Sequence, residues 1–327
     1  MNNKIVVLLK IVVSIGLISF LVSQVNFKEI INIIKNLDLL VITFTVVLLT
    51  LQVFIAAIRW QLILNYQKII FKYKNTLQIL WIGLFFNQAM PSSVGGDVIR
   101  GYYVKANGIT LGRATLAVLM DRLFGLFGLV ITVLISLPLL FKLVNDPIAR
   151  SGVLLIASGV SFALMFLFFT DKFPRNFSHF RVIKFFNSLS KDGRNCIIKN
   201  SNGPLIIMIS VLIHLISVVA VITIAIGLGL NIEWGGFLLI VPLAGLMMVV
   251  PISIAGWGVR EGVMVVGFSY LGVSSEAALA LSILYGLSML LVALPGGVIW
   301  AFKRSHTSIK KQNQALVEDY KDKYEKN

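Results

Sequence analysis

PSSVGGDVIR at residues 91–100 and PISIAGWGVR at residues 251–260 are the two stretches that decide the fold. Each of them interrupts an apolar segment, the first at residues 76–95 and the second at residues 235–273. Proline removes a backbone donor and clashes with the preceding turn of a helix, whereas glycine allows turns that other residues do not. We therefore predict that both segments are broken helices.

The two stretches align without a gap at an offset of 160 residues. Four pairs are identical: Pro91 with Pro251, Ser93 with Ser253, Gly96 with Gly256, and Arg100 with Arg260. Three predicted spans separate the copies, and an odd number of crossings reverses the orientation of the second. This pattern is typical of an inverted-topology repeat with discontinuous helices at its centre. A chance match between helix-breaking residues is the competing interpretation.

The composition indicates that the bilayer is the solvent for most of the chain. Of its 327 residues, 57% are hydrophobic and 13% are charged, whereas charged residues make up about 25% of soluble domains. A helical segment of about 20 residues crosses the hydrocarbon core of a membrane. Six segments are long enough: 5–25, 38–58, 114–140, 152–170, 204–230 and 276–302. The predicted fold is all-α, a polytopic transmembrane helical bundle with two broken or re-entrant helical hairpins related as inverted repeats.

The distribution of Lys and Arg predicts the topology, because cytoplasmic loops carry the excess of basic residues. With the N-terminus inside, 22 of the 29 basic residues fall on the cytoplasmic side and four fall outside. This count places Arg59 in a basic loop at 59–74 and Trp60 at a span end, as an interfacial anchor. We expect a multi-pass protein of the cell inner membrane, with both termini cytoplasmic.

The same distribution explains the net charge of +15 without a nucleic-acid partner, since no basic domain is present to hold a duplex. We expect a transmembrane domain at residues 1–302 and a charged cytoplasmic tail at residues 303–327.

Six charged residues fall within or beside the predicted membrane segments, where each costs about 2.5–3.5 kcal/mol to insert. They are Asp97, Arg100, Asp121, Arg122, Arg260 and Glu261. They indicate either a polar cavity that binds an anionic headgroup or carries protons, or a set of internal ion pairs that tie helices together.

The glycine turns favour anion binding in the cavity, because free amides at the start of a half-helix attract anions. Gly95, Gly96 and Gly256 supply these turns, and Ser93 and Ser253 lie beside them. The guanidinium groups of Arg100 and Arg260 fit a phosphate. Trp257, inside the second break, is a further candidate for the cavity wall.

Three motifs in this order resemble the family of lysylphosphatidylglycerol synthase transmembrane regions, which are flippase-like membrane proteins. They are NQAMPSSVGGDVIR at 87–100, DRLFG at 121–125 and GWGVREG at 256–262. The resemblance covers nearly the whole chain. It implies a domain that moves lipids between leaflets, with the six charged residues lining its core. Only a short tail follows residue 302, so we expect no synthase activity. The three His residues and one Cys show no ligand-like or triad-like placement, so we expect no catalytic residue and no metal, and we expect no cofactor.

Three functions remain open from the sequence. The first is a lipid flippase-like transporter, with a phospholipid or polyprenyl-phosphate lipid as its partner. The second is a membrane-embedded protein that modifies lipids by aminoacyl or glycosyl transfer, which needs a nucleophile with a base or a metal cluster. The third is an ion-coupled solute transporter, which shares the inverted-repeat core. The sequence also leaves open whether the chain forms a homo-oligomer.

Overall fold

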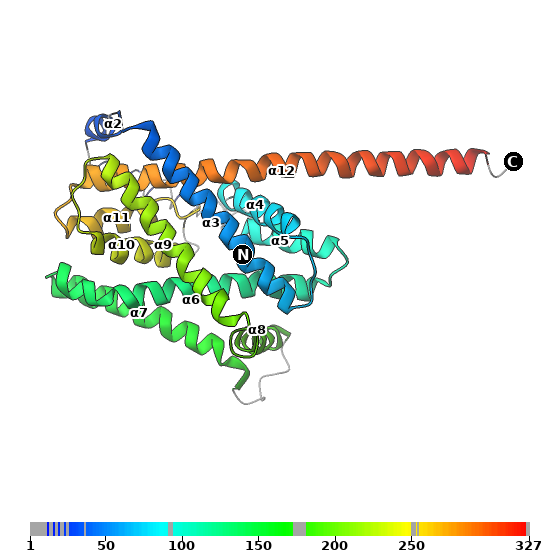
Figure 1. Cartoon of the computed structure of the whole chain (residues 1–327), viewed down its shortest axis with the longest axis horizontal. Helices are drawn as coiled ribbons and strands as arrows, with labels where there is room; N and C mark the ends of the chain where they lie inside the picture. Colours follow the sequence, from blue (N-terminus) through cyan, green and yellow to red (C-terminus); the bar gives the residue numbers. More distant parts are fainter. Residues whose placement is uncertain are drawn as a thin grey trace.

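The computed structural model describes residues 12, 16, 19, 23, 26–35, 37–90, 94–172, 181–249, 253 and 255–324, and every regular element in these ranges is helical (Figure 1). The α-helices are α2 (Phe27–Lys35), α3 (Leu39–Tyr66), α4 (Tyr73–Ala89), α5 (Gly95–Ala106), α6 (Leu111–Leu143), α7 (Pro147–Phe168), α8 (Arg181–Ile198), α9 (Gly203–Gly227), α10 (Trp234–Val249), α11 (Val259–Ser269) and α12 (Ser275–Tyr324). A short 3₁₀ turn, η1 (Thr170–Lys172), follows α7. The prediction of an all-α bundle is confirmed.

Five of these helices are long and apolar enough to cross a membrane: α3, α6, α7, α9 and the part of α12 up to Lys303. They correspond to five of the six predicted spans. The sixth prediction, residues 5–25, lies for the most part outside the described residues. Helix α3 extends to Tyr66, eight residues past the predicted end. The assignment of residues 59–66 to a cytoplasmic loop was therefore wrong, because the charge of Arg59 is compensated inside the protein.

Both predicted breaks are present in the structure. Helix α4 ends at Ala89 and α5 begins at Gly95, and α10 ends at Val249 while α11 begins at Val259. In the second break, Gly256 and Gly258 have φ angles of +81° and +86°. Residues other than glycine rarely adopt such angles. Pro91, Ser93 and Pro251 lie outside the described residues. The inverted-repeat relation between the two hairpins stays a prediction.

The first hairpin is tight because glycine lines its inner face. The Oδ1 atom of Asn87 in α4 accepts a hydrogen bond of 2.9 Å from the Gly96 amide in α5. A Cβ atom on Gly96 would overlap the carbonyl oxygen of Gly83. The backbones of α4 and α5 therefore touch, and the side chains that follow Gly96 are carried directly into the bundle.

Helix α12 is a single helix of 50 residues that packs along α4 and then projects from the bundle (Figure 1). The indole Nε1 of Trp81 in α4 donates a hydrogen bond of 2.7 Å to the carbonyl of Val292. The domain boundary expected at residue 303 falls inside this helix.

An ion pair outside the spans joins α8 to the end of α7. The guanidinium of Arg194 and the hydroxyl of Ser190 both donate to the carboxylate of Asp171 in η1. The hydrogen bond from Arg194 is the main reason that the pKa of Asp171 falls from its ordinary value to about 2. Asp171 therefore stays ionised, and holds α8 in place, throughout the physiological pH range.

Helices α6 and α9 cross at Gly128, and this crossing positions the polar centre described below. A Cβ atom on Gly128 would lie 2.5 Å from the Ser210 backbone in α9, too close for any side chain. Gly128 thus supplies the close packing expected of a small residue in a membrane helix, here within one chain.

The crossing predicts opposite effects for two glycine substitutions in α6. Gly128→Ala inserts a methyl group against the α9 backbone and should lower stability by about 1–3 kcal/mol. Gly112→Ala, the matched control, meets no atom within 4 Å and should raise stability by up to about 1 kcal/mol through helix propensity. Thermal unfolding of both variants in detergent measures the difference, and equal melting temperatures would contradict the packing described.

Candidate functional site

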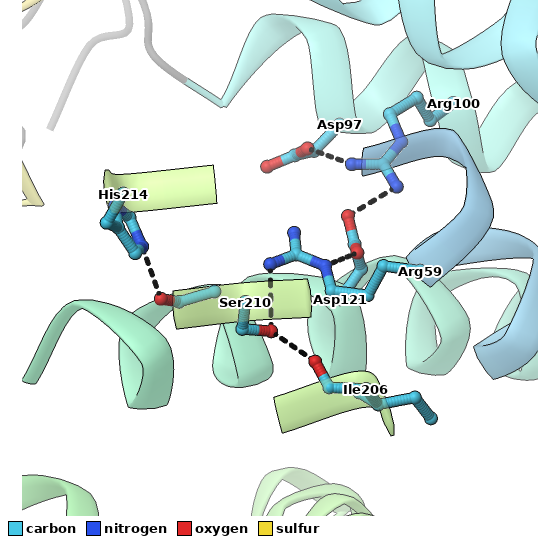
Figure 2. A network of polar contacts seen from close by, with 8 residues as sticks. Arg59, Asp97, Arg100, Asp121, Ile206, Ser210 and His214 are labelled. Carbon is cyan, nitrogen blue, oxygen red and sulfur yellow. Dashed lines mark hydrogen bonds and ion pairs between the residues drawn. The ribbon is translucent and has the colours of Figure 1, made fainter. Parts of the chain in front are cut away.

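The centre of the bundle contains one carboxylate that pairs with two arginines (Figure 2). The Oδ1 atom of Asp121 in α6 accepts from Nε of Arg59 at 2.9 Å, and Oδ2 accepts from Nη2 of Arg100 at 2.7 Å. All three residues are buried. Arg59 comes from α3 and Arg100 from α5, so this single carboxylate joins three helices.

A second carboxylate extends this group towards the surface. The Oδ2 atom of Asp97 accepts from Nε of Arg122 at 2.7 Å, and Oδ1 lies 3.5 Å from Nη1 of Arg100. The Arg122 side chain is 47% exposed, whereas that of Asp97 is 11% exposed. We call Arg59, Asp97, Arg100, Asp121 and Arg122 the Asp121 cluster. It contains three guanidinium groups and two carboxylates, so it carries one surplus positive charge and is open at Arg122.

Small residues make the room that this cluster occupies. A Cβ atom on Gly125 would lie 3.3 Å from the Arg59 guanidinium, and one on Gly83 would lie 2.7 Å from Cγ of Arg100.

Hydrogen bonds also connect the cluster and its surroundings to α9. Nη1 of Arg59 donates to the Ser210 hydroxyl at 3.1 Å. The carbonyl of Gly125 also lies 2.9 Å from Nε2 of His214, so this imidazole hydrogen-bonds to the backbone, as Figure 2 shows.

Arg100 also stacks on a buried aromatic ring. Its Cζ atom lies 4.1 Å from the ring centroid of Trp60, which is fully buried. The interpretation of Trp60 as an interfacial anchor was wrong, because α3 continues past this residue into the bundle. Nε of Arg100 and Nε1 of Trp60 have no hydrogen-bond acceptor among the described residues. A buried N–H group without an acceptor is costly, so an oxygen-bearing ligand or a water molecule would be stabilised here.

The second arginine is paired within a closed cluster between α11 and α12. Nε of Arg260 lies 3.1 Å from Oε1 of Glu261 and 3.2 Å from the Ser282 hydroxyl. Oε2 of Glu261 accepts a 2.6 Å hydrogen bond from the Gly258 amide. The side chains of Arg260 and Glu261 are each 3% exposed, so this pair is electrically neutral and shielded.

Aromatic rings and one glycine complete the Arg260 environment. The Trp257 ring centroid lies 4.7 Å from Cζ of Arg260, and that of Tyr285 lies 5.9 Å away. A Cβ atom on Gly286 would overlap the guanidinium. Trp257 therefore contacts the second arginine, and Ser253 is buried in the same break.

The predicted site residues thus form two groups. Asp97, Arg100, Asp121 and Arg122 come together in the first, and Trp257, Arg260 and Glu261 in the second. Among the described residues, no hydrogen bond or ion pair joins the two groups. Two amides at the starts of the second half-helices are engaged within the protein, since Gly96 donates to Asn87 and Gly258 donates to Glu261.

Sequence reasoning missed Arg59, Ser210 and Ser282, which complete the two groups. The charge of Arg59 favours the end of a span, which is why the sequence alone predicts a loop there. The apolar residues that follow it, in WQLILNY at 60–66, are the signal that the helix continues. For Ser210 and Ser282, no feature of the surrounding sequence indicates that the hydroxyl contacts an arginine.

Comparison with known proteins identifies the family. Residues 7–297 match the family described as lysylphosphatidylglycerol synthase TM region. The chain belongs to this family. The match includes both breaks and both arginine groups, and it ends before the projecting part of α12. Among curated proteins, none matches this chain.

Membership in the lysylphosphatidylglycerol synthase TM region family, together with the five apolar helices, establishes an integral multi-pass membrane protein of a lipid-related family. In such a protein the Asp121 cluster lies among membrane-spanning helices, where an unpaired charge is expensive.

The shared carboxylate predicts a large effect for Asp121→Asn. This change leaves Arg59 and Arg100 without their buried counter-charge and should cost about 3–5 kcal/mol. Glu233→Gln is the control, because it removes one partner of the exposed Lys142–Glu233 pair, and such pairs contribute little. Thermal unfolding in detergent, monitored by intrinsic fluorescence, should show a much lower melting temperature for Asp121→Asn and little change for Glu233→Gln. Similar melting temperatures for both variants would rule out the central role of Asp121.

Proposed function

We propose that this protein binds the phosphate group of a membrane lipid at the Asp121 cluster and moves the lipid between leaflets. The observation that carries the proposal is the surplus positive charge of the cluster, together with its opening at Arg122. Arg59 and Arg100 balance the two carboxylates, so the surplus charge lies at the exposed Arg122. A cation at the opening of the cluster favours an anionic ligand. Both a phospholipid and a polyprenyl-phosphate lipid offer such a phosphate.

The contacts suggest how the phosphate would be accommodated. Arg100 and Asp97 form the longest ion pair of the cluster, at 3.5 Å. A phosphate that approaches from the exposed Arg122 would take the place of Asp97 beside Arg100. Guanidinium groups bind phosphate oxygens in bidentate fashion, and the free Nε donor of Arg100 adds a further contact.

The Arg260 group would serve the opposite stage of transport. In the present conformation Glu261 satisfies Arg260, and neither side chain is accessible. In an alternating-access cycle, helix movement that closes the Asp121 cluster would open the α11–α12 side. Arg260 would then receive the phosphate in exchange for Glu261. The two arginines would thus bind one lipid headgroup in turn.

The proposed orientation follows from the basic residues. Without Arg59 and Arg100, which are buried in the bundle, 20 basic residues remain on the proposed cytoplasmic side and four on the other. This asymmetry still supports cytoplasmic termini in the cell inner membrane. The end of α12 from residue 303 would then form a cytoplasmic tail, next to a transmembrane domain at residues 1–302.

Transport by reconstituted protein tests the proposal. Arg100→Gln and Arg260→Gln should each reduce the translocation of a fluorescent phosphatidylglycerol across vesicles by at least tenfold, while the protein still inserts. Lys142→Gln, which removes an exposed cation, should leave translocation unchanged. Full translocation by both arginine variants would refute the proposal. Mass spectrometry of the recovered lipid shows whether it has been modified, and a covalently altered lipid would indicate an enzyme instead of a transporter.

A further inference from the structure

An apolar groove of about 400 Å³ lies away from both arginine groups, between α6, α7, α10 and α11. We propose that this groove binds an acyl chain of an anionic phospholipid whose phosphate group contacts Arg150. The inference rests on the proposed function only in that both sites take a membrane lipid as ligand.

Four helices build the walls of the groove. Its lining includes Leu140 of α6, Val153 and Ile156 of α7, Met247 of α10, and Val266 of α11. Figure 1 shows α6 running between α7 and the α10–α11 pair. Only Ala157 and Leu164 of α7 are buried, so α7 is largely surrounded by lipid. The groove is therefore in contact with the acyl chains of the bilayer.

The chemistry of the groove favours a hydrocarbon occupant. Among its lining residues only Tyr270 carries a hydroxyl group, and none is charged. Water would find few hydrogen-bond partners there, whereas a flexible hydrocarbon chain matches the polarity of the walls.

One end of the groove carries a cation suited to a phosphate. Nε of Arg150 donates to the carbonyl of Val144, which lines the groove, and Nη2 donates to the carbonyl of Phe141 at 2.9 Å. Among the described residues, no carboxylate lies within ion-pair distance of Arg150. The nearby Asp146 caps α7 by accepting from the amides of Ile148 and Ala149. Arg150 is thus held next to the groove residue Val144 by carbonyl groups at the end of α6, without a carboxylate partner among the described residues.

The groove is separate from the Arg260 group although both use α11. Gly262, Val263, Val266 and Gly267 of α11 line the groove, and none of the lining residues belongs to the Arg260 group. At 3.6 residues per turn, Gly262 lies about 160° around the helix from Arg260, whereas Gly267, two turns further along, lies within about 20° of it. The groove therefore follows the turns of α11 that come after Arg260, so a movement of α11 would change both sites.

Photo-crosslinking tests the proposed site. The full chain is reconstituted in phosphatidylcholine vesicles that contain phosphatidylglycerol with a photoactivatable diazirine in one acyl chain, and the labelled residues are mapped by mass spectrometry. The groove-facing residues Val153 and Val266 should be labelled at least tenfold more than Phe162, a lipid-exposed residue of α7.

Two glycines allow the groove to be filled without disturbing the fold. Gly152 and Gly262 line it, and a Cβ atom at either position meets nothing within 4 Å. Gly152→Leu and Gly262→Leu should each reduce the labelling of Val266 about tenfold. The matched control is Gly159→Leu, on the same helix and equally open but outside the groove, and it should leave labelling unchanged.

The headgroup contact has its own test. Arg150→Gln should remove the preference for the phosphatidylglycerol probe, whose headgroup is anionic, over a phosphatidylcholine probe with the same diazirine chain, in which the choline cation balances the phosphate. The proposal is overturned if Val266 is labelled no more than Phe162, if groove filling does not change its labelling, or if the two probes label the parent protein equally. Arg100→Gln should keep the groove labelling even where transport is lost. A failure of the groove proposal can therefore be distinguished from a failure of the proposed function.

Discussion

The structure depends on one buried carboxylate, that of Asp121, which compensates two arginines from different helices. Arg59 and Arg100 would each be too costly to bury alone in a membrane-spanning bundle. Asp121 lies within hydrogen-bond distance of both, and the small residues Gly83, Gly125 and Gly128 bring the helices close enough for these contacts. Charge compensation and glycine packing are therefore two parts of one arrangement, since the ion pairs form only where the backbones approach closely.

The two arginine groups differ in charge balance and exposure, although the sequences around them are similar. Arg100 shares its carboxylates with two other arginines, and the group is open at Arg122. Arg260 has a carboxylate of its own, and the pair is closed to solvent. Under the proposed alternating-access cycle, the open group and the closed group would exchange these states. The apolar groove, which later turns of α11 also line, is the proposed place for a hydrocarbon chain.

Much of this arrangement could be predicted from the sequence. Long apolar segments identified five helices, and the Pro and Gly residues located both breaks, because these features are local. The partners of each charge could not be predicted, because they depend on which helices pack together. Arg59 shows the difference: its charge suggested the end of a span, whereas Asp121, 62 positions later, allows the helix to continue. Internal ion pairs, one of the two interpretations of the charged residues, are present at both breaks.

Native mass spectrometry of the purified protein most directly tests the central claim that the Asp121 cluster binds a lipid phosphate. The account predicts that the parent protein retains a lipid with an anionic phosphate group, and that Arg100→Gln loses it while Lys142→Gln keeps it. The mass of the retained lipid would identify its class. Equal retention by the parent protein and Arg100→Gln, or retention of uncharged lipids alone, would contradict the account.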